Sequence, residues 1–383
     1  MKAFPAHLMD RAATLAVTLL ITGSITGVLL TACGAAPGRT TVNHAASVGG
    51  ASVSITGART PAAPDPPAGA ARVFGRVFRN LGVTVTGGRL YVTWQANPLT
   101  AAVPRFELAR VDQVTGAIKA AHLLVPGQVG TPLAAGGWLW VPVVSPAGWS
   151  LLRLDPVGLT GTGVLSAGGG SGEGAGRSSH LAVAGGALWV AAGDRLLRVS
   201  LMTGQVIAAI SLPGAYSSDV AANQGGTILV ASEASDGGLG WVQRRDPVTG
   251  ALIASRQMLG VAAPGIGGVI GSGVWVAEAT GMMGYIERFR TTTMAPDPAT
   301  EVGGTNGIDV TVAGGLAWVT EEVNPSHDYC ANPVTGKVLA RIRLPDPGQD
   351  DVLAASDRYV YYESRAGNGF YLRRFPVPGV CRA

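Results

Sequence analysis

The sequence has few charged side chains and very few lysines. Charged residues make up 14% of the 383 residues, whereas about 25% is usual in globular proteins. The lysines are Lys2, Lys119 and Lys337, and the arginines are scattered singly, so the formal net charge of +4 forms no basic run. Because nucleic-acid binding needs clustered positive charge, we expect no nucleic-acid partner.

Familiar catalytic motifs are missing as well. The sequence contains no Gly-x-Ser-x-Gly elbow and no clustered His/Cys metal motif. The glycine-rich stretch 168–176 lies between expected strands, and no Lys-Ser/Thr pair follows it, as a phosphate-binding loop would require. The sequence thus has no evident catalytic set and no cofactor motif, which favours a protein without enzymatic activity.

Cysteine is scarce, and the first of the three has a distinctive context. Leu30-Thr31-Ala32-Cys33 matches the lipobox pattern [LVI]-[ASTVI]-[GAS]-C, and it follows a short segment with Lys2 and Arg11 and an apolar run over 12–30. This segment resembles the signal peptide of bacterial lipoproteins. The resemblance implies cleavage before Cys33, acylation of its sulfur with fatty acids such as palmitate, and display on the extracytoplasmic face of the cell membrane. The alternative is a retained membrane-spanning helix, for which ~20 apolar residues suffice.

The other two cysteines, Cys330 and Cys381, remain for pairing. Two cysteines outside the cytoplasm usually form a disulfide bond, which would pin the end of the chain to the preceding part of the fold. The alternative is two unpaired, partly buried thiols.

Composition divides the chain into three parts. Residues 1–32 form the expected signal peptide. Residues 33–71 are rich in Ala, Gly, Pro, Ser and Thr with almost no large apolar side chain, which predicts a lipid-anchored disordered linker. Residues 72–383 carry a repeat and form the expected folded domain.

The repeat joins a short apolar strand, a Gly-Gly or similar turn and an aromatic-Val pair. Seven copies occur, with equivalent residues at Tyr91, Trp140, Trp189, Leu229, Trp275, Trp318 and Val360. Their spacing of 40 to 49 residues is that of a four-stranded propeller blade. No segment has a convincing helical period, so the sequence predicts an all-β fold.

A second signature, Asp-Pro-x-Thr-Gly, follows the aromatic-Val pair, as at Asp246-Pro247-Val248-Thr249-Gly250. Asp caps the backbone, Pro fixes φ and Gly supplies a positive φ, so the motif predicts a tight turn between the third and fourth strands. The last copy ends without a fourth strand, whereas residues 72–78 alternate like one. We therefore expect a seven-bladed β-propeller of four-stranded blades, with the last blade closed by this N-terminal strand.

The repeat resembles the YVTN and virginiamycin B lyase-like propellers, which are related to the NHL and PQQ-type families. The resemblance covers about residues 72–383 and implies the fold, because a propeller repeat hosts unrelated functions. In the lyases, a glutamate and a magnesium ion act with histidines in a Pro-His-Gly context. None of the histidines at 44, 122, 180 and 327 lies in that context, so the resemblance does not extend to lyase activity.

Carboxylates are expected to gather at one mouth of the propeller. The aligned copies place three aspartates at the start of the first strand of a blade and three glutamates at the end of the second, namely Asp219, Asp309, Asp351, Glu278, Glu321 and Glu363. Converging carboxylates can hold a divalent cation or a cationic ligand. The alternative is a solvated polar rim.

Together these patterns predict a monomeric, lipid-anchored, extracytoplasmic propeller that acts as a binding or protein-interaction module for a protein, peptide or glycan. The alternative function is a metal-dependent lyase or hydrolase that uses the carboxylates at the mouth.

Overall fold

A computed structural model of the chain describes residues 82–95, 105–123, 128–145, 148–167, 181–212, 215–223, 226–234, 239–258, 264–280, 283–297, 302–305, 308–321, 327–342, 351–366 and 369–382. The chain divides into two units, Met1–Ala36 and Pro37–Ala383, and all described residues belong to the second. The signal peptide and linker predicted at 1–71, and the strand predicted at 72–78, lie outside the described residues. None of the described residues forms a helix of the length and apolar character needed to span a bilayer.

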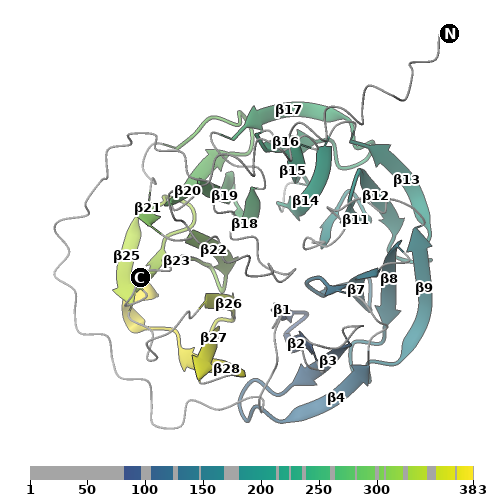
Figure 1. Cartoon of the computed structure of the whole chain (residues 1–383), viewed down its shortest axis with the longest axis horizontal. Helices are drawn as coiled ribbons and strands as arrows, with labels where there is room; N and C mark the ends of the chain where they lie inside the picture. Colours follow the sequence, from purple (N-terminus) through teal and green to yellow (C-terminus); the bar gives the residue numbers. More distant parts are fainter. Residues whose placement is uncertain are drawn as a thin grey trace, which may run out of the picture. The chain divides into compact units, whose positions relative to one another are not determined.

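Seven antiparallel sheets stand around a common axis, so the predicted seven-bladed β-propeller is confirmed (Figure 1). The first four blades follow one another along the chain. Blade 1 contains β1 (Gly82–Thr86), β2 (Arg89–Gln95), β3 (Phe106–Val111) and β4 (Ile118–Leu123). Blade 2 contains β5 (Gln128–Val129), β6 (Leu133–Ala135), β7 (Trp138–Ser145), β8 (Gly148–Leu154) and β9 (Gly161–Ala167). Blade 3 contains β10 (Leu181–Ala184), β11 (Ala187–Ala192), β12 (Arg195–Ser200) and β13 (Val206–Ser211). Blade 4 contains β14 (Ala215–Ala222), β15 (Ile228–Ala234), β16 (Trp241–Arg245) and β17 (Leu252–Gln257).

The remaining three blades complete the ring. Blade 5 contains β18 (Gly265–Ile270), β19 (Gly273–Thr280), β20 (Met283–Arg290) and β21 (Val302–Thr305). Blade 6 contains β22 (Ile308–Ala313), β23 (Leu316–Glu321), β24 (His327–Ala331) and β25 (Val338–Ile342). Blade 7 has three described strands, β26 (Asp351–Ala355), β27 (Tyr359–Ala366) and β28 (Gly369–Pro376), and the 3-10 helix η2 (Gly379–Cys381) follows it. In blade 2 both β5 and β6 pair with β7, so they are two halves of one interrupted innermost strand.

Strand direction gives the propeller two different faces. We call "base" the face with the turns from first to second strand and from third to fourth strand. We call "mouth" the opposite face, with the loops from second to third strand and the links between blades. The outer strands β4, β9, β13, β17, β21 and β25 lie at the rim (Figure 1). Because each follows a base turn, all of them run from the base toward the mouth.

Local sequence accounts for the hairpins at the base. Gly87 and Gly88 have φ values of 55° and 71°, the positive angles that a two-residue hairpin requires and glycine adopts without strain. The aromatic residue that follows is buried: Tyr91 and Trp189 have no exposed surface. Burial of such a side chain contributes about 1.5–3 kcal/mol.

The equivalence predicted for blade 7 was wrong by one residue. Ala354 pairs with Tyr361 as Thr84 pairs with Tyr91, so Tyr361 and not Val360 is the repeat aromatic. The cause is the turn around Asp357 and Arg358, which has no Gly-Gly pair to mark the register. Tyr361 is fully buried, and this burial raises its pKa to about 12.

The turn from third to fourth strand has the predicted chemistry. Asp246 Oδ1 accepts hydrogen bonds from the backbone N–H groups of Val248 and Thr249 at 2.9 and 2.7 Å, and Gly250 has a φ of 75°. In blades 2 and 5, Leu159 and Met294 adopt the same left-handed conformation with φ of 57°. A non-glycine residue there costs about 1–2 kcal/mol, which burial of both side chains offsets.

The hydrophobic core is divided among the joints between blades. Val92 of blade 1 packs in one cluster with Tyr361 of blade 7, and Trp318 of blade 6 packs with Val360 of blade 7. Each blade therefore buries its apolar face against its neighbour, and the ring is stabilised joint by joint.

Candidate functional site

Three of the carboxylates predicted at the mouth have equivalent backbone positions. Each of these aspartates pairs with the residue two places after the repeat aromatic, a position that Leu229 holds in blade 4. The pairs are Asp219 with Ala231, Asp309 with Thr320 and Asp351 with Glu363. The same register corrects the position of Glu363. It is two residues after Tyr361, whereas Glu278 and Glu321 are three after their tryptophans, so Glu363 is on the opposite face of its sheet.

Asp219 lies inside β14, which begins at Ala215, and not at the start of the strand as predicted. Its side chain is 3% exposed. Its Oδ2 accepts a hydrogen bond from the Ile266 N–H of blade 5 at 2.8 Å, and its Oδ1 accepts one from the Val220 N–H at 2.6 Å. Asp219 therefore joins blade 4 to blade 5.

The other predicted mouth residues are only partly described. The side chains of Glu278, Asp309, Glu321 and Asp351 lie outside the described part of the structure, and Glu363 is partly buried. Among the side chains that are described, no group of three or more His, Cys, Asp and Glu residues could hold a metal ion. The carboxylate site at the mouth therefore stays a prediction.

A cavity of ≈ 680 Å³ opens on the base, where blades 6, 7 and 1 meet. Its lining includes four cationic side chains and two carboxylates, Arg89, Arg110, Lys119, Arg358, Asp112 and Asp357. Sequence reasoning missed this cavity, because its lining comes from turns of three blades that are far apart in the chain.

An arginine on the third strand of most blades reaches the base turn of the next blade. Arg110 Nε donates to the Val157 carbonyl at 2.8 Å, and Arg153 Nη1 donates to the Met202 carbonyl at 2.9 Å. Two further bonds are of the same kind. Arg244 of blade 4 donates to the Thr292 carbonyl of blade 5, and Arg374 of blade 7 donates to the Val114 carbonyl of blade 1. The last of these closes the ring. Sequence reasoning missed these arginines, although each precedes its turn aspartate or equivalent residue by two positions, as in Arg110-Val111-Asp112.

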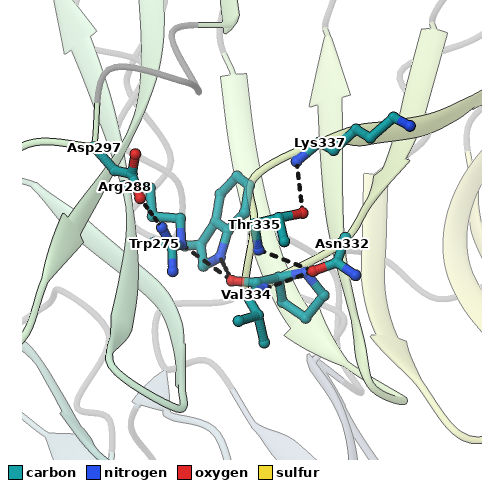
Figure 2. A network of polar contacts seen from close by, with 8 residues as sticks. Trp275, Arg288, Asp297, Asn332, Val334, Thr335 and Lys337 are labelled. Atoms are coloured by element: carbon teal, nitrogen blue, oxygen red, sulfur yellow. Dashed lines mark hydrogen bonds and ion pairs between the residues drawn. The ribbon is translucent and has the colours of Figure 1, made fainter.

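Figure 2 shows the equivalent contact between blades 5 and 6, in which Trp275, the repeat aromatic of blade 5, also takes part. Trp275 Nε1 and Arg288 Nε both donate to the carbonyl of Pro333, at 3.0 and 3.1 Å. Arg288 is 3% exposed and forms an ion pair with Asp297. The guanidinium is therefore buried with its charge matched, as a buried ion requires.

Blade 6 has a cysteine where the other blades have this arginine. Cys330 is two residues before Asn332, as Arg110 is two before Asp112, and it forms a disulfide bond with Cys381. Both side chains are buried. A covalent bond thus fixes η2, which follows β28, at the joint between blades 6 and 7.

Electrostatics at the turns favour ionised aspartate. The Thr115 backbone N–H, followed by the Thr115 hydroxyl and the Val114 N–H, hydrogen-bonds to Asp112 and lowers the pKa of its carboxyl to about 2. The Thr249 N–H lowers the pKa of Asp246 in the same way, with a smaller contribution from the charge of Arg198 in blade 3. These carboxylates therefore serve the turns as hydrogen-bond acceptors.

The fold and these joints define the class of the protein as a seven-bladed β-propeller. The sequence matches no protein-family model and no curated protein. Among solved structures, the chain is similar to BamB from Moraxella catarrhalis, with a TM-score of 0.49 and 13% identity over 77% of this chain and 84% of that chain. Altogether 1060 chains of solved structures match, and so broad a likeness says nothing about function.

Proposed function

We propose that the chain is a lipid-anchored, extracytoplasmic β-propeller that acts as a binding or protein-interaction module. The disulfide bond between Cys330 and Cys381 carries the proposal, because such bonds persist outside the cytoplasm and are rare inside it. The lipobox that ends at Cys33 supports the same location and supplies the anchor.

The joints between blades support a role in binding. Hydrogen bonds and the disulfide fix the third strands and base turns of neighbouring blades. A rigid ring holds the base turns in constant positions, which lowers the entropic cost of binding a partner. The partner is a protein, a peptide or a glycan, and the chain acts as a monomer.

Metabolic labelling with a fatty-acid analogue and membrane fractionation test the anchor. The full chain should incorporate the label and sediment with membranes, whereas Cys33→Ser should lose the label. Cys381→Ser breaks the disulfide bond but leaves the lipobox intact, so it should keep the label. Labelling that persists in Cys33→Ser would contradict the proposal.

Binding is tested with the purified chain against peptide and glycan arrays, with thermal shift as the second readout. A ligand of the propeller should raise the melting temperature, and the shift should grow with the logarithm of the ligand concentration above Kd. Turnover of any such ligand would instead favour the enzymatic alternative.

A further inference from the structure

The tips of the base turns carry exposed apolar side chains. The third residue of this turn is Val or Met in five of the blades, namely Val114, Val157, Met202, Val248 and Val334. These side chains are between 47% and 86% exposed. The turn itself does not require an apolar side chain there, since only the backbone N–H of this residue bonds to the aspartate. Thr292 holds the same position in blade 5.

Further exposed apolar side chains lie on the base beyond the turn tips. Ile118, Val206 and Leu252 begin the outer strands directly after these turns and are 51%, 37% and 53% exposed. Among the exposed large apolar side chains of the described residues, Leu239 is the one that lies in a loop of the mouth. Exposed apolar side chains that recur on the same turn of five blades indicate contact with a partner or a membrane.

Exposed cations surround the apolar tips. They lie at the turns and strand ends of the base, at Lys119, Arg290, Lys337, Arg358 and Arg382. The carboxylates of this face are fewer: Asp112 lies 3.6 Å from Lys119 Nζ, and Asp297 pairs with Arg288. Asp155 and Asp246 accept backbone N–H groups of their turns, and Asp357 lines the cavity. The base therefore presents accessible positive charge together with apolar surface.

The cavity on the base adds a pocket with an excess of cations. Its lining has four cationic side chains and two carboxylates, those of Asp112 and Asp357. Its volume of ≈ 680 Å³ falls in the range of small-molecule sites, roughly 300–1,000 Å³. A phospholipid headgroup fits within this volume, and its phosphate carries charge complementary to the cations of the lining.

The predicted tether also leads to the base. Because outer strands run from the base toward the mouth, a closing strand at 72–78 would begin at the base, where the linker 33–71 would leave the domain. A random coil of that length has a root-mean-square span of about 35 Å. An acyl anchor at Cys33 would thus be attached to the domain on the side of the base.

We propose that the base is a membrane-docking face that binds anionic phospholipid. The valine and methionine tips enter the interface, the surrounding lysines and arginines attract the headgroups, and the mouth faces away from the membrane. The proposal rests on the lipid-anchored function proposed above, to which it adds an orientation and a ligand class.

Vesicle flotation tests the proposal with a soluble chain that begins at Pro37, the unit that contains every described strand. This chain lacks Cys33, so the result does not depend on acylation. It should float with vesicles that contain phosphatidylglycerol, only weakly with pure phosphatidylcholine, and less as salt increases. No binding to the anionic vesicles would overturn the docking face. It would not bear on the lipid anchor, which acyl labelling tests separately.

Two triple variants with matched controls locate the surface. Neutralising Lys119, Arg290 and Lys337 to Gln should weaken binding roughly a hundredfold, because each basic residue near an anionic surface contributes about a fivefold factor. Replacing Val114, Val248 and Val334 with Ser should weaken binding severalfold. Their controls on the mouth side, Arg195→Gln and Leu239→Ser, should bind as the parent chain does.

Three other outcomes would also overturn the proposal. The first is binding that both triple variants retain in full. The second is glycerol phosphate that saturates the cavity while vesicles stay unbound, which would indicate a soluble phosphate ligand. The third is dimerisation of the soluble chain that the Val→Ser variant abolishes, which would assign the apolar tips to a second copy. Melting temperatures of the variants close to the parent value exclude misfolding.

Discussion

Cys330 is bonded to Cys381 at the joint between blades 6 and 7. In its described part, blade 7 has no turn from third to fourth strand that could accept a hydrogen bond from an arginine of blade 6. At the joints on either side, arginine fulfils this role: Arg288 binds the Pro333 carbonyl of blade 6, and Arg374 binds the Val114 carbonyl of blade 1. The disulfide therefore takes the place of this repeated hydrogen bond at the joint between blades 6 and 7.

Removal of this bond should destabilise the ring. The two cysteines are 51 residues apart, and closing a loop of this length in the unfolded chain contributes about 2–4 kcal/mol. We expect Cys330→Ala with Cys381→Ala to lower the melting temperature by several degrees. A reducing agent should lower that of the parent by a similar amount and leave the double variant unchanged. Equal stability of the oxidised parent and the variant would contradict this role.

The arginine joints should contribute measurably to stability. Arg153 donates to the Met202 carbonyl at 2.9 Å, and its guanidinium lies 4.5 Å from the centre of the Trp138 ring. Arg153→Met keeps the aliphatic stem but loses both interactions, so we expect a loss of about 1.5–3 kcal/mol in the free energy of unfolding. Urea denaturation measures the difference. Arg195→Met, at an exposed position on β12, is the control and should change stability by less than ~0.5 kcal/mol.

Acid should destabilise the protein through its turn aspartates. The pKa of Asp112 is about 2 in the folded protein, below the ordinary value of 3.8, and that of Asp246 is also lowered. A lowered folded pKa gives stability that is present above pH 3.8 and is lost as the pH falls toward 2. Asn332 forms the same turn with a side chain that does not titrate. Asp112→Asn with Asp246→Asn should therefore fold at neutral pH and show a flatter decline of melting temperature over this interval.

The sequence predicted the parts of the fold that local chemistry determines. Gly87-Gly88 and Asp246-Pro247-Val248-Thr249-Gly250 set their turns within a few residues, so the blades could be counted from the chain alone. Joints between blades depend on residues about 45 positions apart, and only an alignment of the third strands would have revealed Arg110 and its equivalents. The position of Tyr361 was missed because its turn lacks glycine, and this error misplaced Glu363.

Closure of blade 7 can be tested by truncation. Residues 72–78 are predicted to pair with β28, whose outer edge would otherwise be open to other chains. A chain beginning at Ala71 should fold normally, whereas one beginning at Gly82 should aggregate or melt at a lower temperature. Calorimetry and light scattering measure both effects. Identical melting temperatures for the two chains would refute this closure.

The carboxylates predicted at the mouth make the alternative function testable. If Glu278 and Glu321 hold a divalent cation, millimolar calcium, magnesium or manganese should stabilise the fold, by ~2.7 kcal/mol at a hundredfold excess over Kd. Glu278→Gln with Glu321→Gln should abolish this shift and leave the fold intact. Asp219→Asn should instead lower stability with or without the cation, because Asp219 already joins blade 4 to Ile266 of blade 5. A melting temperature that none of the three cations changes would mean that the mouth is a solvated rim, and the metal-dependent lyase or hydrolase would lose its basis.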